Sequence, residues 1–331
     1  MQIINALKDN FDFKNPVVTI GNFDGVHLGH QKILARVVQT AQQIGGTPAA
    51  ISFEPHPVKV LSPERGLKML TTLDDKVRLL SQSGLKALII IPFDREFSQI
   101  EPENFIKDIL VKKLGIKWLI VGHNFSFGKR KKGKTNLLRQ KAKKYCFGFS
   151  VVRYAKVDGN IVSSSKLRSF IQKGRIFEAN RMLGRAYHIK GTVIKGTGRG
   201  TAILNIPTAN VNSPNEVIPK EGVYAVKVSL CDSPTAEGVN DQNSLRQCMI
   251  YDGAANIGKN PTFGDINFVS LEVHILDFNN VLLGRELRIH FIERIRDEER
   301  FSGVEELRKY IMQDIEKARN ILPKKKLPVF L

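Results

Sequence analysis

Cysteine is scarce in this chain of 331 residues, and long apolar runs are missing. The three cysteines, Cys146, Cys231 and Cys248, lie far apart and have no metal-ligand spacing; an odd, sparse count is typical of a reducing compartment. The longest apolar run, near Ala87–Ile91, is far too short to span a bilayer, and Met1–Lys14 has no signal-peptide run. We therefore expect a cytoplasmic protein with no membrane partner.

Acidic residues are also few: 32 Asp and Glu stand against 51 Lys and Arg, giving a net charge of +19. Such an excess is compatible with nucleic-acid binding. However, the sequence has no RNA-recognition aromatic motif, no zinc-finger spacing and no repeat. The basic residues are scattered, with local runs at Lys129–Lys134, Lys141–Lys144 and Lys324–Lys326. Polyphosphate substrates or a basic proteome explain the charge equally well, so a nucleic acid is not the favoured partner, and the oligomeric state is left open.

The length predicts about two domains, and the first half has the pattern of an α/β domain. Short apolar runs at Pro16–Ile20 and Thr47–Phe53 enclose Leu28–Ile44, whose apolar residues recur at helical spacing. Leu85–Ile91 is continuously apolar, as expected for a strand covered on both faces. Strands that alternate with helices predict a parallel sheet.

The second half has a different pattern, which begins near Tyr187. Short β-rich segments such as Val223–Leu230 and Asn267–Leu276 are separated by Gly, Pro and Asn. This spacing is typical of a small antiparallel barrel or sandwich. One amphipathic helix, Val304–Ala318, follows and is expected to pack across it. Asp232–Leu245 is polar and is expected to be a surface loop.

The most informative motif is Gly21–His30, GNFDGVHLGH, which follows the first expected strand and opens the first expected helix. In an open α/β sheet ligands bind at this place. Gly21 and Gly25 allow the backbone to approach a phosphate closely, and the helix N-terminus offers N–H groups to an anion. His27 and His30 are three residues apart, so both can face one ligand.

The motif is similar to the HxGH motif of the nucleotidylyltransferase superfamily. In its full form it resembles bacterial bifunctional riboflavin kinase/FMN adenylyltransferases, also called FAD synthetases. Further segments resemble that family in the same order: Phe53–Pro57, Val121–Gly128 and Ser163–Arg168. Ser165 stands where the family usually has threonine, which keeps the hydroxyl. The resemblance implies a Rossmann-like FMN adenylyltransferase domain over residues 1–185.

The resemblance implies a reaction in which an FMN phosphate oxygen attacks the α-phosphorus of ATP and pyrophosphate leaves. The chemistry needs positioning and charge neutralisation more than a covalent nucleophile. The implied catalytic residues are His27, His30 and Arg168. The implied ATP-binding residues are Gly21, Phe23, Asp24, Gly29, Ser164 and Ser165. The implied flavin-binding residues are Pro55, His56, Asn124, Phe125 and Phe127.

Several of these residues also have a purely structural interpretation. Phe125 and Phe127 are also expected in a hydrophobic core, and Arg168 in a surface ion pair. Asp24 either binds nucleotide or orients its loop. The run Lys129–Lys134 is by default a solvated loop.

Beyond Tyr187 five segments resemble the riboflavin kinase module, again in family order: Pro207–Asn210, Gly222–Val226, Ala255–Gly264, Ser270–Phe278 and Glu293–Phe301. The resemblance implies a riboflavin kinase domain over residues 186–331. Riboflavin, FMN and ATP are the implied small-molecule substrates, with ATP used twice.

Residue chemistry supports the kinase interpretation. Glu272 lies in an alternating strand whose Leu271, Val273 and Ile275 face the core, so its carboxylate faces away from the core and can take the proton of an attacking hydroxyl. A solvated strand carboxylate is the alternative. Thr208 and Asn210 offer oxygen ligands suited to Mg²⁺ beside ATP phosphates.

The resemblance also implies that Gly198 and Gly200 approach the ATP phosphates. By default the charged stretch Glu293–Arg300 is a solvated turn, but the resemblance implies a loop that closes over the flavin, with Arg296 as its contact.

The glycine-rich stretch over residues 196–207 departs from the family. Asn205 and Ile206 stand where glycine and phenylalanine usually precede the proline, one extra residue is present, and a basic residue is missing.

Three alternatives stay open beside the bifunctional enzyme. They are an adenylyltransferase with a structural or regulatory barrel, a nucleic-acid-binding protein with a borrowed fold, and an adenylyltransferase acting on pantetheine phosphate or nicotinamide mononucleotide.

Overall fold

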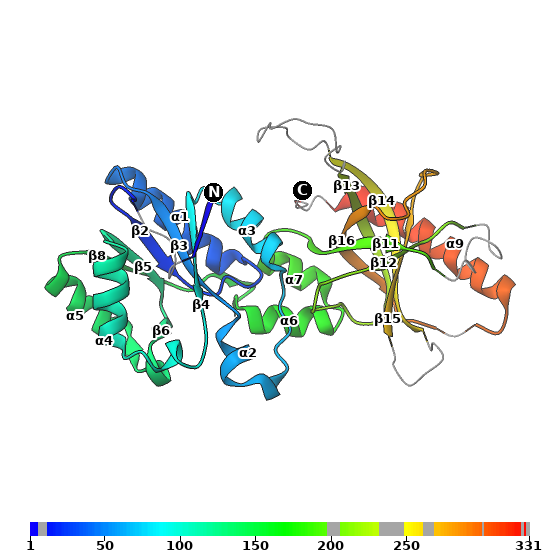
Figure 1. Cartoon of the computed structure of the whole chain (residues 1–331). Coiled ribbons are helices and arrows are strands. Elements are labelled where there is room, and N and C mark those ends of the chain that lie inside the picture. Colours follow the sequence, from blue (N-terminus) through cyan, green and yellow to red (C-terminus); the bar gives the residue numbers. More distant parts are fainter. Residues whose placement is uncertain are drawn as a thin grey trace. The chain divides into compact units, whose positions relative to one another are not determined.

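The structure is a computed structural model that describes residues 1–5, 12–196, 206–231, 248–260, 268–299, 301–325 and 328. By its internal contacts the chain divides into two units, Met1–Ser164 and Ser165–Leu331 (Figure 1). The sequence predicts a functional boundary between residues 185 and 186 instead. Helices α6 (Ser164–Gln172) and α7 (Ile176–Leu183) lie between the two divisions. A division by contacts need not coincide with one by function, so the predicted boundary stays a prediction.

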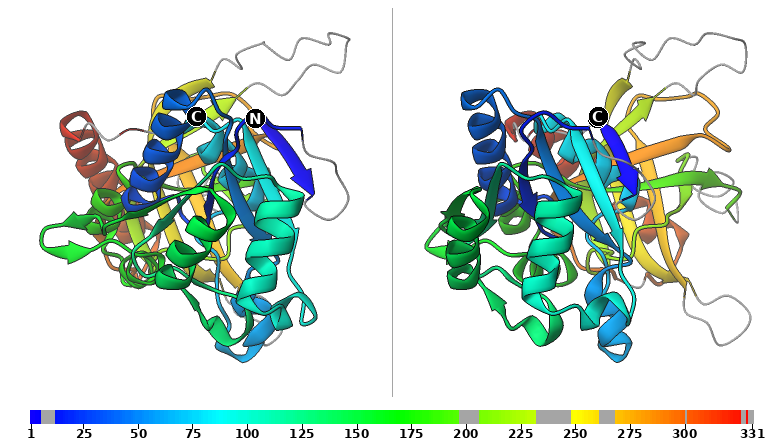
Figure 2. Two further views of the ribbon diagram at one scale, coloured as in Figure 1. Left: turned by 90° about the vertical axis from the view of Figure 1, so that its left-hand side faces the viewer. Right: turned by 60° about the vertical axis from the view of Figure 1, so that its left-hand side comes forward.

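Unit 1 is built on a parallel sheet with the strand order β1-β4-β3-β2-β5-β8. Its strands are β1 (Gln2–Asn5), β2 (Val17–Ile20), β3 (Pro48–Glu54), β4 (Ala87–Pro92), β5 (Trp118–Gly122) and β8 (Gly148–Val152). The central strands are apolar at successive positions because helices cover both faces of the sheet (Figure 2). The expected parallel α/β domain is confirmed.

Helices connect these strands. The main ones are α1 (Leu28–Gln43), α3 (Leu73–Gln82), α4 (Pro102–Asn104), the π-helix η3 (Phe105–Lys113) and α5 (Thr135–Tyr145). Shorter elements are α2 (Pro57–Leu61), η1 (Pro63–Arg65), η2 (Phe97–Gln99), η4 (Lys129–Lys131) and the hairpin strands β6 (Ser126–Phe127), β7 (Gly133–Lys134), β9 (Lys156–Val157) and β10 (Asn160–Ile161). The predicted helix Leu28–Ile44 therefore differs from α1 by one residue.

The strand order places a ligand-binding position in unit 1. The chain moves from β2 outward through β3 to β4 on one side, and then continues on the other side of β2 with β5 and β8. Such a reversal leaves a crevice at the carboxyl ends of the strands beside it. Those ends are Ile20 of β2 and Gly122 of β5. The segments Gly21–His30 and His123–Gly128 leave the sheet there.

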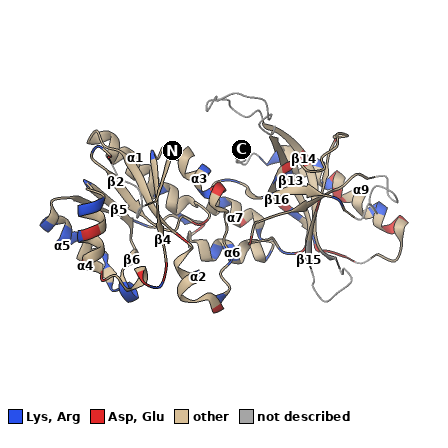
Figure 3. Cartoon of the chain, in the orientation of Figure 1, with Lys and Arg blue, Asp and Glu red and all other residues tan. Residues whose placement is uncertain are grey.

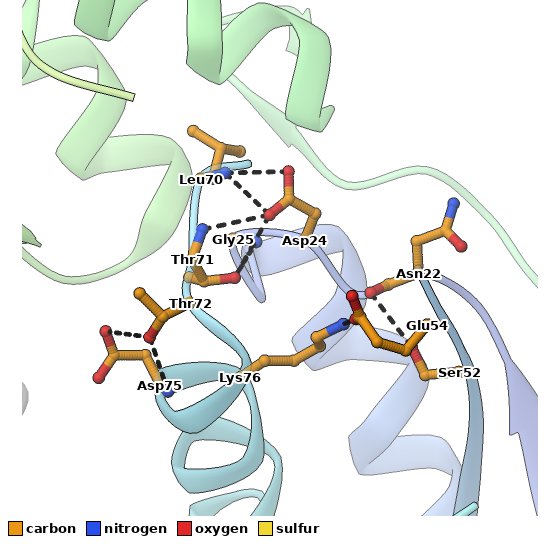
Figure 4. A network of polar contacts seen from close by, with 10 residues as sticks. All are labelled: Asn22, Asp24, Gly25, Ser52, Glu54, Leu70, Thr71, Thr72, Asp75 and Lys76. Carbon is orange, nitrogen blue, oxygen red and sulfur yellow. Dashed lines mark hydrogen bonds and ion pairs between the residues drawn. The ribbon is translucent and has the colours of Figure 1, made fainter. Parts of the chain in front are cut away.

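Asp24 ties the first of these segments to a distant loop (Figure 4). Its side chain is 2% exposed. Its carboxylate accepts hydrogen bonds from the backbone N–H groups of Leu70, at 2.9 and 3.2 Å, and Thr71, at 3.2 Å. The Thr71 hydroxyl donates a further bond at 3.3 Å and accepts one from the Gly25 N–H at 3.3 Å. A buried carboxylate with this many donors is stable as the anion and fixes both loops.

Unit 2 contains an antiparallel barrel that closes in the order β11-β12-β15-β14-β13-β16, with β16 paired back to β11. Its strands are β11 (Tyr187–Ile194), β12 (Ala209–Asn212), β13 (Gly222–Cys231), β14 (Cys248–Asn260), β15 (Phe268–Ile275) and β16 (Glu286–Arg296). The predicted choice between barrel and sandwich is thus settled as a barrel. Leu271, Val273 and Ile275 are buried as the alternating pattern predicts.

Helix α9 (Val304–Ile321), followed by η5 (Leu322–Lys324), packs on β13, β14 and β16. An ion pair fixes it: the Arg296 guanidinium donates to both carboxylate oxygens of Asp314, at 2.7 to 3.1 Å. Both side chains are largely buried, at 14% and 5% exposed. The predicted terminal helix is therefore confirmed, and it continues three residues beyond Ala318.

Cys231 and Cys248 form a disulfide between directly paired positions of β13 and β14, with Cα atoms 4.1 Å apart. Their separation of 17 residues gave no sign of this contact in the sequence. The predicted surface loop Asp232–Leu245, which follows Cys231, lies outside the described residues. Among the residues described, no helix has the length and apolar character needed to cross a bilayer.

Replacing Asp24 with Asn tests the role of the buried carboxylate. The amide turns one acceptor into a donor that faces backbone N–H groups, so we expect unit 1 to lose about 3 kcal/mol of unfolding free energy. Trp118, the single tryptophan of the chain, lies in unit 1, so its fluorescence in a urea titration follows this unit alone. Asp12→Asn, at an exposed aspartate of the same unit, is the control. Equal midpoints for the two variants would contradict the assignment.

Candidate active sites

The loop between β2 and α1 has an unusual backbone. Phe23 and Val26 have φ angles of 51° and 37°, and Gly25 lies between them at 83°. Positive φ is disfavoured for residues with side chains, above all for a β-branched valine, and such residues gather at ligand sites. Phe23 and Val26 are each 1% exposed, so core packing holds the loop in this form.

His27 caps helix α1 and His30 lies in its first turn. The His27 Nδ1 accepts the backbone N–H of His30 at 3.2 Å. A neutral His27 ring must therefore carry its proton on Nε2, the atom then able to donate to a phosphate oxygen. The two rings stack with centroids 3.7 Å apart. A Cβ on Gly29 would lie 3.0 Å from the His27 ring, which explains the glycine.

Two predicted flavin-side segments leave β3 and β5, the strands on either side of β2, at the same edge of the sheet. Pro55 and His56 follow β3 after a cis peptide bond between Glu54 and Pro55, and the His56 Nδ1 caps α2 by accepting the Val58 N–H at 3.1 Å. Asn124 follows β5 and is exposed. The carboxyl ends of parallel strands meet at one edge, so topology brings these segments beside the Gly21–His30 loop.

The predicted residues Phe125 and Phe127 lie in or against the hydrophobic core. Phe127 is 7% exposed and packs on Phe105, and Phe125 stacks on Phe127 with centroids 5.5 Å apart. This supports their structural interpretation, and flavin contact stays a prediction. Asp24 likewise directs its carboxylate to Leu70 and Thr71, which favours loop orientation over nucleotide binding.

Lys76 is a buried cation that no sequence motif marked. It lies on α3, is 3% exposed, and pairs with Glu54 at 3.5 Å (Figure 4). Its ammonium thus lies beside the carboxyl end of β3, next to the Pro55–His56 turn. The sequence spacing could have indicated this burial. Lys76 lies three and four residues before the buried Leu79 and Leu80, so it is on the apolar face of α3.

The Ser163–Arg168 segment is divided between the units. The Ser164 hydroxyl donates to the backbone carbonyl of Asp24 at 2.9 Å, which joins it to the Gly21–His30 loop. Ser165 is exposed and Arg168 is half-buried, and both lie on α6 in unit 2. Their contacts with ATP stay predictions.

The basic run at Lys129–Lys134 spans η4 and strand β7 of the β6–β7 hairpin, just before α5 (Figure 3). Acidic partners balance part of this charge: Lys129 pairs with Glu101 at 3.7 Å and Lys141 with Glu103 at 2.7 Å. The hydrogen bond from Lys141 lowers the pKa of Glu103 below its ordinary value. In both pairs the carboxylate is exposed, as is typical of an ion pair at the protein surface.

In the barrel, Glu272 of β15 is paired directly with Asn210 of β12 on one side and with Asn256 of β14 on the other. Thr208 precedes β12 and is partly buried. The backbone just before β12 is fixed by His274, two residues beyond Glu272, whose Nδ1 lies 2.8 Å from the Pro207 carbonyl. The carbonyl accepts, so Nδ1 carries the proton. Asn210, one of the two predicted metal ligands, is therefore directly opposite Glu272, and Thr208, the other, is two residues before Asn210 in the chain.

Ion pairs fix the charged stretch at the end of β16. Asp297 lies 2.7 Å from both Arg294 and Lys220, and these cations hold the Asp297 pKa well below its ordinary range. Burial raises the pKa of the neighbouring Tyr224 hydroxyl. Arg296, the predicted flavin contact, donates instead to Asp314 on α9, so flavin contact by this residue stays a prediction. Gly198 and Gly200 lie outside the described residues.

Comparison with known proteins places both halves of the chain in one family. A family model described as FAD synthetase matches residues 10–166, and one described as riboflavin kinase matches residues 183–322. A bifunctional riboflavin kinase/FMN adenylyltransferase of Buchnera aphidicola is 33% identical over 95% of this chain and 96% of its own. The protein of the same name from Listeria monocytogenes is 36% identical over 94% of this chain and 93% of its own.

A solved structure supports the fold of the whole chain. A crystal structure from Streptococcus pneumoniae, titled as a macrolide-efflux protein, matches with a TM-score of 0.83 and 26% identity, covering 97% of this chain and 98% of that one. Its title concerns that protein alone. The matches in both halves, the near-complete coverage and the order of the motifs agree: the chain belongs to the family of bifunctional riboflavin kinases/FMN adenylyltransferases.

Proposed function

We propose that this protein makes FAD from riboflavin in two ATP-dependent steps. The barrel unit phosphorylates riboflavin to FMN, and the α/β unit adenylylates FMN. The observation that carries the proposal is that both family models match one chain, each over most of the corresponding predicted site. The substrates are therefore riboflavin, FMN and ATP, and we propose the cytoplasm as the location. In a reducing cytoplasm the Cys231–Cys248 pair would be mainly in the thiol form.

For adenylylation, an FMN phosphate oxygen bonds to the α-phosphorus of ATP while the bond to the β-phosphate oxygen breaks and pyrophosphate leaves. The N-terminus of α1 attracts the phosphates through its dipole and its backbone N–H groups. His27 and His30 donate hydrogen bonds to oxygens that gain charge. Arg168, Ser164 and Ser165 are proposed to bind the phosphates of ATP. Pro55, His56 and Asn124 would line the flavin side.

For phosphorylation, Glu272 takes the proton of the ribityl 5′-hydroxyl as its oxygen bonds to the γ-phosphorus, and ADP leaves. The Thr208 hydroxyl and the Asn210 amide oxygen are hard oxygen donors close to Glu272, which fits Mg²⁺. They would hold the ion, and its charge would offset that of the ATP phosphates. Gly198 and Gly200 are proposed to approach the phosphates, and Arg296 the flavin.

A product assay tests the whole proposal. Purified protein is incubated with riboflavin, ATP and Mg²⁺, and the flavins are separated by chromatography. FMN should form first and FAD second. If FAD forms from supplied FMN but not from riboflavin, the protein has adenylyltransferase activity alone. The altered stretch at residues 196–207 would then be the expected cause of the missing kinase activity. If neither flavin is converted, the proposal is wrong.

The histidine pair is tested by the double variant His27→Ala/His30→Ala. Loss of two donors to the phosphates should lower kcat for FAD formation about a thousandfold or more. Riboflavin phosphorylation by the same protein should stay within about twofold of wild type, because that site is in the barrel. Lys32→Ala, an exposed residue on the same helix, is the matched control. Loss of both activities in a folded variant would refute independent sites.

The proposed base is tested by Glu272→Gln, which keeps the shape of the side chain and removes the proton acceptor. We expect FMN formation to fall by about a hundredfold to ten-thousandfold, while adenylylation of supplied FMN continues. Glu305→Gln, at an exposed position in the first turn of α9, controls for the loss of one charge. A Glu272 variant with more than about a tenth of wild-type kcat would exclude Glu272 as the base.

A further inference from the structure

Three polar side chains form a row across neighbouring strands of the barrel: Asn210 of β12, Glu272 of β15 and Asn256 of β14. The register pairs Asn210 directly with Glu272, and Glu272 directly with Asn256. Directly opposed residues project from the same face of a sheet with Cβ atoms about 5 Å apart. The residues beside them in each strand, such as Ala255, Ile257 and Val273, are buried, so the row faces away from the barrel interior.

Among the residues that the structure describes, the Oδ1 of Asn256 has no hydrogen-bond partner. For Asn256 this is costly, because its Oδ1 is fully buried. A buried acceptor without a donor costs about 1–3 kcal/mol, and native proteins keep few of them. Asn210 and Glu272 already have proposed ligands, whereas Asn256 has none.

Glu298, two residues beyond the end of β16, lies at one side of the row. Gly258 is two residues from Asn256 and so projects from the same face of β14. A Cβ at Gly258 would collide with the carboxylate of Glu298. Glu298 therefore lies over β14 two positions from Asn256.

On the basis of the proposed kinase function, we propose that Asn256 is a substrate-binding residue of that site, whose Oδ1 accepts a hydrogen bond from the ribityl 4′-hydroxyl of riboflavin. The 5′-hydroxyl must reach Glu272, and the 4′-hydroxyl is on the adjacent carbon. The directly opposed position of Asn256 suits that neighbouring hydroxyl. The contact fills the unpartnered acceptor and holds the chain so that the 5′-oxygen points at Glu272.

The test compares two full-length proteins, wild type and Asn256→Ala, on two substrates, riboflavin and 4′-deoxyriboflavin. Asn256→Ala should lower kcat/KM for riboflavin at least about tenfold, the usual cost of losing a buried hydrogen bond to a substrate. With 4′-deoxyriboflavin, wild type and variant should agree within about twofold, because the contact is already absent. The KM for ATP in riboflavin phosphorylation should not change, which reports that the barrel of the variant is folded.

Asn212→Ala, an exposed asparagine of β12, is the matched control and should behave as wild type. Asn256→Ser keeps an oxygen acceptor and replaces the alanine variant in the test if that variant does not fold. Any loss of kcat/KM in the serine variant must also be confined to riboflavin. Unchanged activity on riboflavin, or equal losses on both substrates, would overturn the role of Asn256. A wild-type protein that phosphorylates neither substrate would instead refute the kinase function itself.

Discussion

A buried negative charge, the carboxylate of Asp24, is the constraint on which the α/β site depends. It fixes the Leu70–Thr71 backbone, while the Asp24 carbonyl accepts a bond from Ser164. Between these contacts the loop keeps the positive φ angles of Phe23 and Val26. Those angles turn the chain so that His27 caps α1 and stacks on His30. The strain of the loop is thus offset by buried hydrogen bonds, and the groups proposed to bind phosphate are positioned before a ligand arrives.

The barrel obtains its site by register rather than by a buried charge. Closure through β11 and β16 fixes which residues of β12, β15 and β14 stand opposite one another. A shift of one residue in any pair would turn Glu272 toward the barrel interior. Arg296 contributes from the outside, because its pair with Asp314 fixes α9 on the strands next to the site. The two halves therefore position phosphate chemistry by different physical means.

The net charge of +19 is explained without a nucleic acid. Both proposed reactions bring polyanionic ATP to the protein, and long-range attraction by a basic surface speeds such encounters. Part of the basic surface is balanced locally, as at Lys129 and Lys141. Family membership over nearly the whole chain argues against a nucleic-acid-binding protein and against an adenylyltransferase for pantetheine phosphate or nicotinamide mononucleotide. Whether one or both flavin activities operate is decided by the product assay.

The sequence by itself determined the two-module order, the strand–helix alternation, the alternating face of Glu272 and the position of Gly21–His30 between strand and helix. These follow from periods of two and 3.6 residues and from local motifs, which are legible over short windows. Only the tertiary structure decided that the second half closes as a barrel, that Asp24 binds Leu70, that Cys231 meets Cys248, and that Asn256 stands opposite Glu272. Those pairings join residues distant in the chain, and they are set by register and burial across whole sheets, which no local pattern encodes.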